Sequence, residues 1–260
     1  MKAIHGGKSK NDKIDALKIA SLLRGGMIPQ AYVYPREMRA TRDLLRRRMY
    51  IMRRRAELLT HIQNTTSQYN LPEFQTCLAY RKNRNGVAEL FPDPAVRVSI
   101  EADLDLIDFY DDLLKRLELF ILRSAREHDP NALLRLRSVP GIGKILSLVI
   151  LYEIHVISRF DSVQDFASYA RLVICSKTSA GKRVGSGGRK IGNAHLKWAF
   201  SEAAVLFLRG NLQAQAWLAR KAARHGKAKA LSMLAHKIGR AVYFLLARER
   251  AFDMNTFLAA

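Results

Sequence analysis

Two long stretches with apolar residues at alternating spacings of four and three limit most strongly how this chain can fold. The first lies in a helical pattern over residues 36 to 69, and the second in one over residues 99 to 127. Such an alternation is the repeat of a coiled-coil seam. The predicted seam residues are Leu45, Met49, Met52, Ala56 and Leu59 in the first stretch and Leu106, Tyr110, Leu113, Leu117 and Phe120 in the second.

The segment between these two stretches is irregular. Residues 71–98 contain Pro72, Pro92, Pro94 and the turn-forming pair Asn85-Gly86, which all interrupt helices. We therefore predict a mainly α fold in which residues 36–128 form a long antiparallel helical arm, a coiled coil. We also expect this arm to pair between subunits, which makes a homo-oligomer the expected assembly.

The chain is strongly basic. It has 44 Lys and Arg against 23 Asp and Glu, a formal net charge of +21 at pH 7. This balance favours a polyanionic partner, although a basic ribosomal protein would have a similar charge. Many Arg residues with almost no acid occupy the first long helix, so we favour phosphate contacts there over a merely solvated face. The candidates are Arg46, Arg47 and Arg48.

A Pro-Gly-Ile-Gly turn lies between two apolar helical patterns, within Val139-Pro140-Gly141-Ile142-Gly143-Lys144. Two glycines two positions apart permit a tight turn, and the first N–H groups of the next helix can face an oxyanion. This pattern is typical of a helix-hairpin-helix motif, which holds a DNA phosphate without reading bases. Gly141, Gly143 and Lys144 are the predicted contacts, and an ordinary interhelical turn is the alternative interpretation.

Residues 176–193 form a segment of small and basic residues without any acid. Backbone donors and cations suit a phosphodiester, both for binding and for stabilising a charged transition state. The predicted phosphate-binding residues are Lys182, Arg183, Arg189 and Lys190. A serine here could attack phosphorus, although most serines in such loops are simple loop hydroxyls and no His is adjacent in sequence. A short β-ribbon fits residues 171–191.

The N-terminal part predicts one short helix, followed by an extended connector over residues 27–35. Asp12 and Asp15 are three residues apart in the helix over residues 11–23, so their carboxylates share one face of its first turn. Such a pair could hold a divalent cation. It is also the pattern of an ordinary helix start, with Asn11 or Asp12 as the cap, and by spacing alone we favour this second interpretation.

The remaining composition places the chain in a reducing compartment. Cys77 and Cys175 are far apart, which suggests neither a zinc site nor a disulfide framework. The first twelve residues lack the apolar core of a signal peptide, and no apolar run reaches the length of about 18 residues that a membrane span needs. We therefore expect a cytoplasmic, nucleoid-associated protein that does not contact a membrane.

Four segments in the same order resemble the C-terminal half of DEDD-type insertion-sequence transposases, the insertion-sequence one-ten family related to Piv-type invertases. They are LRSVPGIGKILSLVILYEI, RFDSVQDFASYARLV, TSAGKRVGSGGRKIGNAHLK and GKAKALSMLAHKIGRAVYFLL. The segment KNDKIDALKIASLLRGGMIPQAYVYP and the Arg-rich RDLLRRR resemble the part that follows the nuclease motif in that family.

The resemblance implies a DNA transposase and site-specific recombinase that cuts and rejoins strands. The family carries four Mg²⁺-binding acids on a ribonuclease-H-like domain, and in several members a structured guide RNA directs it. Asp12 and Asp15 match the last two acids, and Ser179 matches the nucleophilic serine. Ala180 stands where glycine is common in the family, so Ser176 and Ser186 remain alternatives to Ser179.

One departure from the family concerns the N-terminus. Eleven residues precede Asp12, room for one or two average strands, so the sheet and two of the four acids have no place in the given sequence. We expect a nuclease-domain remnant over residues 1–35, the arm over 36–128 and a transposase domain over 129–260. Either the chain is a truncated copy with impaired catalysis, or Met1 is a misplaced start. A non-catalytic DNA- or RNA-binding module that pairs with full-length transposase is the alternative function.

Overall fold

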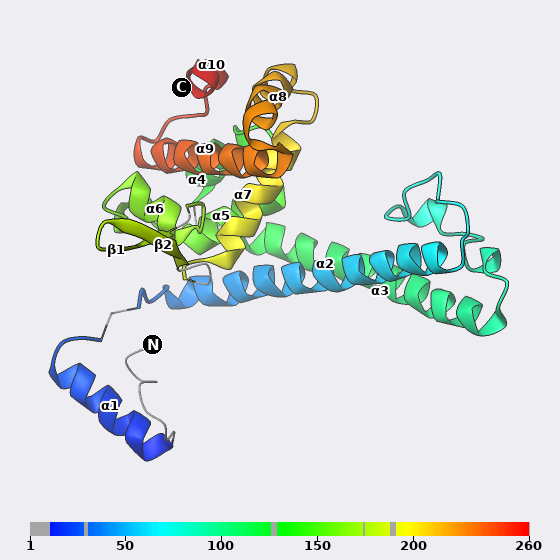
Figure 1. The fold of residues 1–260 in the computed structure, drawn as a ribbon, viewed down its shortest axis with the longest axis horizontal. Helices are drawn as coiled ribbons and strands as arrows, with labels where there is room; N and C mark the ends of the chain where they lie inside the picture. Colours follow the sequence, from blue (N-terminus) through cyan, green and yellow to red (C-terminus); the bar gives the residue numbers. More distant parts are fainter. Residues whose placement is uncertain (1–10, 29–30, 126–128, 174, 188–190, 260) are drawn as a thin grey trace. The chain divides into compact units, whose positions relative to one another are not determined.

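The computed structural model describes residues 11–28, 31–125, 129–173, 175–187 and 191–259. The contacts divide the chain into two compact units, Met1–Pro35 and Arg36–Ala260. Both units are mainly α-helical, which confirms the predicted fold class (Figure 1). The second unit contains a long helical arm and a globular part.

The first unit contains the helix α1, Asp12–Arg24. The side chain of Asn11 caps it by accepting a hydrogen bond from the N–H of Ile14 at 2.8 Å. The helix ends at Gly25, followed by Gly26 in the left-handed region at φ +63°. No residue of α1 is buried.

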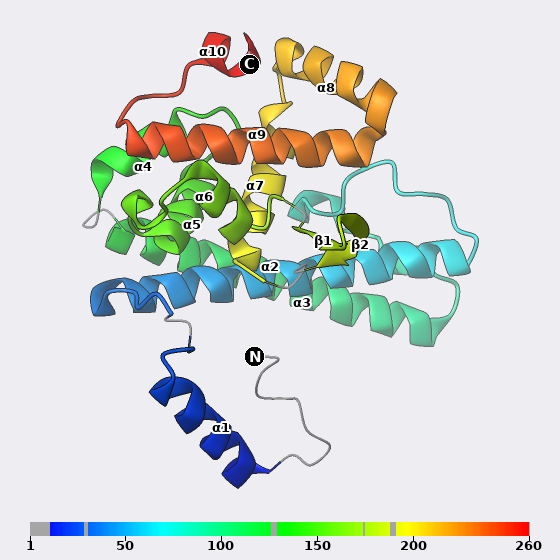
Figure 2. The ribbon, with the colours of Figure 1, turned by 60° about the vertical axis from the view of Figure 1, so that its left-hand side comes forward.

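The arm consists of two helices, α2 (Arg36–Gln68) and α3 (Pro94–Ser124), which lie side by side along their length (Figures 1 and 2). They are antiparallel, because ion pairs join Arg48 to Glu118 and Arg55 to Asp111, with numbers rising on α2 and falling on α3. The helix α3 starts five residues earlier than predicted, since Asp93 caps it and Pro94 fits its first turn.

The register of α3 in the arm differs from the predicted seam. The residues of α3 that the structure buries are Ile100, Ile107, Leu114 and Ile121. The predicted residues Leu106 and Phe120 are 45% and 61% exposed, next to this seam. The helix carries two adjacent apolar stripes with the same seven-residue repeat, so periodicity alone could not indicate which stripe packs on α2.

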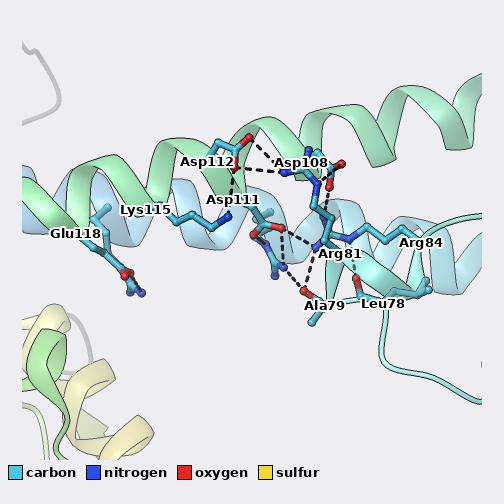
Figure 3. A network of polar contacts seen from close by, with 11 residues as sticks. Leu78, Ala79, Arg81, Arg84, Asp108, Asp111, Asp112, Lys115 and Glu118 are labelled. Atoms are coloured by element: carbon cyan, nitrogen blue, oxygen red, sulfur yellow. Dashed lines mark hydrogen bonds and ion pairs between the residues drawn. The ribbon is translucent and has the colours of Figure 1, made fainter.

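Buried polar contacts fix the tip of the arm, between α2 and α3 (Figure 3). Arg84 is 5% exposed, and its guanidinium donates to the carbonyls of Leu78 at 2.9 Å and Ala79 at 3.0 Å. It also pairs with Asp111 of α3 at 2.7 Å and with Asp108. One side chain therefore ties the irregular tip to α3, because a buried Arg needs partners for its several donors.

Short 3-10 turns and a small apolar core complete the tip. The turns are Arg81–Asn83 and Ala88–Leu90. Phe91 and Ile62 are fully buried within this core. The segment predicted to be irregular is thus a packed cap on the end of the two helices.

The globular part is built from seven α-helices, a 3-10 turn (Ile157–Arg159) and one β-hairpin in the described residues. The elements are α4 (Pro130–Arg137), α5 (Lys144–Ile154), α6 (Val163–Tyr169), β1 (Cys175–Ser179), β2 (Lys182–Gly187), α7 (Ala194–Phe207), α8 (Leu212–His225), α9 (Lys227–Ala247) and α10 (Met254–Ala259). The hairpin lies within the range predicted for a β-ribbon.

The helix α5 is the centre of the globular core. Every residue from Leu146 to Ile154 is buried, because α2, α4 and α7 all pack around this helix. The core continues into the arm through Met38, Leu45 and Met49 of α2. Burial of this apolar surface is the main force that holds the arm to the globular part.

By length and composition alone, α9 could cross a membrane, and it is the one such helix in the described part of the chain. Its buried face includes Leu234, Ile238 and Val242. The contacts of α9 with α7 and α8 make it a core helix of the globular part.

Candidate functional site

Ser179 lies at the exposed tip of the β-hairpin. It ends β1 and faces Lys182, the first residue of β2, across a two-residue turn. The turn residues Ala180 and Gly181 have φ +47° and +74°, the left-handed geometry of a tight hairpin turn. Ser179 and Lys182 are both exposed, so a hydroxyl and an ammonium stand together on an open protrusion.

The alternative serines are opposite each other further down the hairpin. Ser176 of β1 is the register partner of Ser186 of β2. The side chains of these two serines and of Arg183 lie outside the described part, as do Arg189 and Lys190 altogether. Of the predicted phosphate-binding residues in this segment, the structure therefore places the side chain of Lys182.

The chain leaves the hairpin segment through a tightly fixed turn before α7. The N–H of Asn193 donates to the carbonyl of Tyr169 at 2.6 Å, and Arg171 donates to the carbonyl of Gly192 at 2.9 Å. Gly192 has φ +92°, and a Cβ there would lie 2.5 Å from the Tyr169 oxygen. A glycine is needed at this close approach, which anchors the base of the hairpin segment to the end of α6.

Asn193 then links this turn to the buried carboxylate of Glu153. Its Oδ1 caps α7 by accepting from the N–H groups of His195 at 2.8 Å and Leu196 at 3.1 Å. Its Nδ2 donates to Glu153 Oε2 at 2.7 Å. One amide side chain therefore fixes both the start of α7 and its attachment to α5.

Two arginines of the arm also bind Glu153. Arg46 donates to both carboxylate oxygens, at 2.7 and 3.0 Å, and Arg42 donates at 3.0 Å. Burial alone would raise the pKa of Glu153, but the bonds from Arg46 and Asn193 and the charges of Arg42 and Arg46 outweigh it and lower the pKa. The carboxylate is thus held ionised while its side chain is 3% exposed.

His195 lies beside this cluster. Burial lowers the pKa of its imidazole, and the charges of Arg46, Arg53 and Arg42 lower it further against the opposing effect of Glu153. Its Nδ1 is buried without a hydrogen-bond partner among the described residues. Burial and these arginines therefore favour the neutral form of the imidazole, which lies at the start of α7.

Sequence reasoning missed the role of Glu153 and Asn193. The signal for Glu153 was present, because it is the only charged residue in the apolar run ILSLVILYEI. A lone acid in a buried helix requires cationic partners. Those partners are far away in sequence, on α2, and no spacing pattern identifies them.

The Pro-Gly-Ile-Gly turn is an ordered connection between α4 and α5. Gly141 has φ +83°, and a Cβ there would lie 2.5 Å from the backbone nitrogen of Phe207. Gly143 is the N-cap of α5 with no side-chain cap, and Gly143 and Lys144 are exposed. Packing against α7 thus requires a glycine at position 141. The first backbone N–H groups of α5 and the ammonium of Lys144 can donate hydrogen bonds to a bound anion.

The three arginines singled out on α2 have different environments. Arg46 pairs with Glu153, as described above, and Arg48 is 8% exposed and pairs with Glu118 at 2.6 Å. Arg47 is exposed and stacks over Tyr50 at 5.5 Å. The fold thus engages Arg46 and Arg48 internally and leaves Arg47 facing solvent.

Asp12 and Asp15 belong to the first turn of α1, in the other unit of the chain. Asp12 is exposed and Asp15 is half-buried. Among the described residues, no group of three or more His, Cys, Asp or Glu is arranged to hold a metal ion. Two carboxylates on one turn do not by themselves fit Mg²⁺, which takes ligands in near-octahedral geometry.

An exposed serine opposite an exposed lysine at the tip of a hairpin is a candidate site for phosphodiester chemistry. Residues 133–218 match the family model described as Transposase IS116/IS110/IS902 family. This match spans α4 to α8, including both the turn at Gly141 and the hairpin at Ser179. It confirms the family resemblance of the sequence over these residues, which are similar to insertion-sequence transposases. No curated protein matches the chain.

Proposed function

We propose that this chain binds DNA through its globular part and joins strands with Ser179 as the nucleophile. The observation that carries the proposal is the position of Ser179, at the open tip of a hairpin inside the segment that matches the transposase family. The exposed Lys182 lies directly across the turn. Its ammonium can bind a non-bridging phosphate oxygen while the hydroxyl attacks phosphorus.

The proposed step exchanges one phosphoester bond for another. The Oγ of Ser179 forms a bond to phosphorus, the bond from phosphorus to one deoxyribose oxygen breaks, and that oxygen leaves as a hydroxyl after taking up a proton. The serine proton passes to solvent, which reaches the exposed tip. Attack by another strand's hydroxyl on the phosphoserine reverses the exchange and joins the new strand, with no net loss of phosphoester bonds.

Contacts around the hairpin segment support the proposal, because they fix its C-terminal end to the rest of the fold. The hairpin segment returns through Gly192 and Asn193, and Asn193 is fixed to Glu153 and thereby to Arg42 and Arg46 of the arm. In this proposal, Gly143 and Lys144 contact a neighbouring DNA phosphate through the N-terminus of α5. Mg²⁺ enters as an expectation from the family, in which Asp12 and Asp15 would supply part of a site completed by other carboxylates.

A covalent-trapping assay tests the nucleophile. The chain is incubated with end-labelled DNA carrying the ends of the element, with Mg²⁺, and denatured before electrophoresis. We expect a protein–DNA adduct that Ser179→Ala abolishes while DNA binding is unchanged, and that Ser201→Ala, an exposed serine on α7, retains. Loss of the adduct in Ser176→Ala or Ser186→Ala instead of Ser179→Ala would reassign the nucleophile.

The second candidate function is a DNA-binding module that pairs with other transposase chains through its arm. The exposed apolar stripe on α3, with Leu106, Phe109 and Phe120 at 45%, 55% and 61% exposure, favours such pairing. DNA binding without any adduct in the trapping assay would identify this function. We propose homo-oligomer formation through the same stripe, and a guide RNA as a partner that a competition assay with DNA would detect.

A further inference from the structure

A cavity of about 780 Å³ lies between α8, α9 and α10, away from the hairpin. Figures 1 and 2 show α10 and α8 next to each other along α9. The volume is in the range of small-molecule sites, roughly 300–1,000 Å³. Most of its lining follows residue 218, where the family match ends.

Aromatic rings form the apolar part of the cavity. Trp217 and Phe257 are 8% and 7% exposed, and Phe244 and Phe252 are half-buried. Phe252 and Phe257 pack on each other at 5.1 Å between ring centroids, and both contact Phe207 in the core. The rings are therefore held in place before any ligand arrives, which lowers the entropy cost of binding.

Cations surround these rings. They are Lys221, Lys237, Arg240, Arg248 and Arg250. The acid in the lining is Asp253, whose carboxylate caps α10 by accepting from the N–H of Asn255 at 3.0 Å and from Thr256. None of the five cations forms an ion pair within the described part of the chain, so the cavity presents an excess of positive charge.

Lys237 is half-buried and lies beside two of the rings. Its ammonium is 5.6 Å from the Trp217 ring centroid and 5.2 Å from that of Phe257. Burial and then the charge of Lys221 lower the pKa of Lys237. A bound anion would offset the repulsion between these two lysines. A half-buried lysine among cations that form no ion pair in the described part of the chain is an arrangement expected of an anion site.

We propose that this cavity binds an unpaired nucleotide, with its base on the aromatic rings and its phosphate on the surrounding lysines and arginines. Bases stack on aromatic side chains whatever their identity, and Arg forks fit phosphate oxygens. A paired duplex keeps its bases inside the stack, so only a flipped, bulged or single-stranded nucleotide can enter. The inference rests on the proposed function in taking nucleic acid as the partner.

An acidic peptide is the competing occupant. Its carboxylates would match the cations. The Asp and Glu side chains of such a peptide, however, offer no flat apolar group that could stack on the rings of Phe244 and Phe252. A nucleotide satisfies both halves of the cavity with one ligand. The observations therefore favour the nucleotide, and the peptide becomes an outcome of the test.

Trp217 can report binding directly. The sequence has two tryptophans, so Trp198→Phe leaves Trp217 as the only one. We expect adenosine monophosphate and a short single-stranded oligonucleotide to quench its fluorescence saturably, and unphosphorylated adenosine to bind more weakly. Equilibrium dialysis of labelled adenosine monophosphate against the unmodified chain provides the same answer if Trp198→Phe disturbs the fold.

Matched variants separate the cavity from general charge. Arg240→Gln combined with Arg248→Gln is expected to weaken adenosine monophosphate binding about tenfold or more, the effect of losing one charge-assisted hydrogen bond. Arg137→Gln combined with Arg209→Gln removes the same charge from exposed positions outside the cavity and is expected to leave this binding unchanged. Phe244→Leu is expected to weaken binding, while Phe120→Leu on the arm is not.

The outcomes distinguish this inference from the proposed function. If duplex DNA binds but neither nucleotide probe affects Trp217 or is retained in dialysis, the cavity inference is wrong and the function stands. If the nucleotides bind but duplex DNA does not, the function fails and the cavity inference stands. Quenching by polyglutamate without any by nucleotides would overturn the inference in favour of a protein partner.

Discussion

Gly141 and Gly143 occupy one turn but face different constraints. A Cβ on Gly141 would lie 2.5 Å from the backbone nitrogen of Phe207, at φ +83°, whereas Gly143 has nothing within 4 Å. Gly141→Ala should therefore lower the free energy of unfolding by about 2–5 kcal/mol, from backbone strain and overpacking together. Gly143→Ala should change it by less than about 1 kcal/mol. Urea unfolding of both variants measures the difference, and equal effects would contradict the packing role of Gly141.

Glu153 holds two arginines of the arm and the cap of α7, so its charge should stabilise the fold. Glu153→Gln leaves Arg42 and Arg46 without their carboxylate and is expected to lower the free energy of unfolding by about 3 kcal/mol at pH 7. Glu57→Gln is the control, because Glu57 is an exposed acid paired with Arg54 on one helix face. That change should stay within about 0.5 kcal/mol.

The effect of Glu153 should depend on pH in a defined direction. Its pKa is lower in the folded chain than in the unfolded chain, so its stabilisation is complete above the unfolded value, about 4.3. It is lost as the pH falls through the lower folded value. The difference between the unmodified chain and Glu153→Gln should therefore narrow below about pH 4. A difference that grows on acidification would show that the carboxyl is protonated in the fold.

At the scale of elements, α3 carries two apolar stripes with different functions. Ile107 is fully buried against α2, while its neighbour Leu106 is 45% exposed. Ile107→Ala should lower the free energy of unfolding by about 2–5 kcal/mol, and Leu106→Ala by less than about 1. If the exposed stripe pairs between chains, Leu106→Glu combined with Phe120→Glu should dissociate the oligomer and leave the helical content intact. Sedimentation velocity measures the mass of the oligomer and circular dichroism measures the helical content. An unchanged mass would contradict pairing through this stripe.

Sequence periodicity was sufficient for the elements and insufficient for their contacts. It predicted α1, α2 and the hairpin range because caps, proline and apolar spacing act locally. It chose the wrong stripe of α3, because two stripes one residue apart have the same repeat. Periodicity also could not predict the ion-pair partners of Glu153 and Arg84, because buried ion pairs join residues that are close only after folding.

For the candidate site, the sequence led to a prediction of the chemistry, which stays a prediction, and it left most of the geometry open. The absence of acids around Ser179 and the Gly-rich turn were visible in the residues. The link from Asn193 through Glu153 to the arm was not, because it depends on how α5, α7 and α2 pack. Through this link the arm helps to hold the hairpin segment in place. No single segment of the sequence indicates such a connection.

At the scale of the whole molecule, the net charge of +21 should dominate DNA affinity. Binding of a polycation to DNA releases counterions, so affinity for random duplex should fall about 10³–10⁵-fold between 50 and 200 mM salt if 6–10 phosphates are contacted. Charge alone, however, does not specify which residues provide those contacts, and the arginines of α2 separate the possibilities.

Arg47 is exposed, whereas Arg48 lies buried in its pair with Glu118. Arg47→Gln should therefore reduce the slope of log affinity against log salt by about one, at unchanged stability. Arg48→Gln should leave that slope unchanged and instead lower the free energy of unfolding by about 1–3 kcal/mol, because the carboxylate of Glu118 loses its partner. Fluorescence anisotropy over a salt series and urea unfolding test both. A smaller slope of log affinity against log salt in Arg48→Gln would mean that DNA binding separates α2 from α3 and frees this guanidinium. The two helices of the arm would then have to come apart when DNA binds.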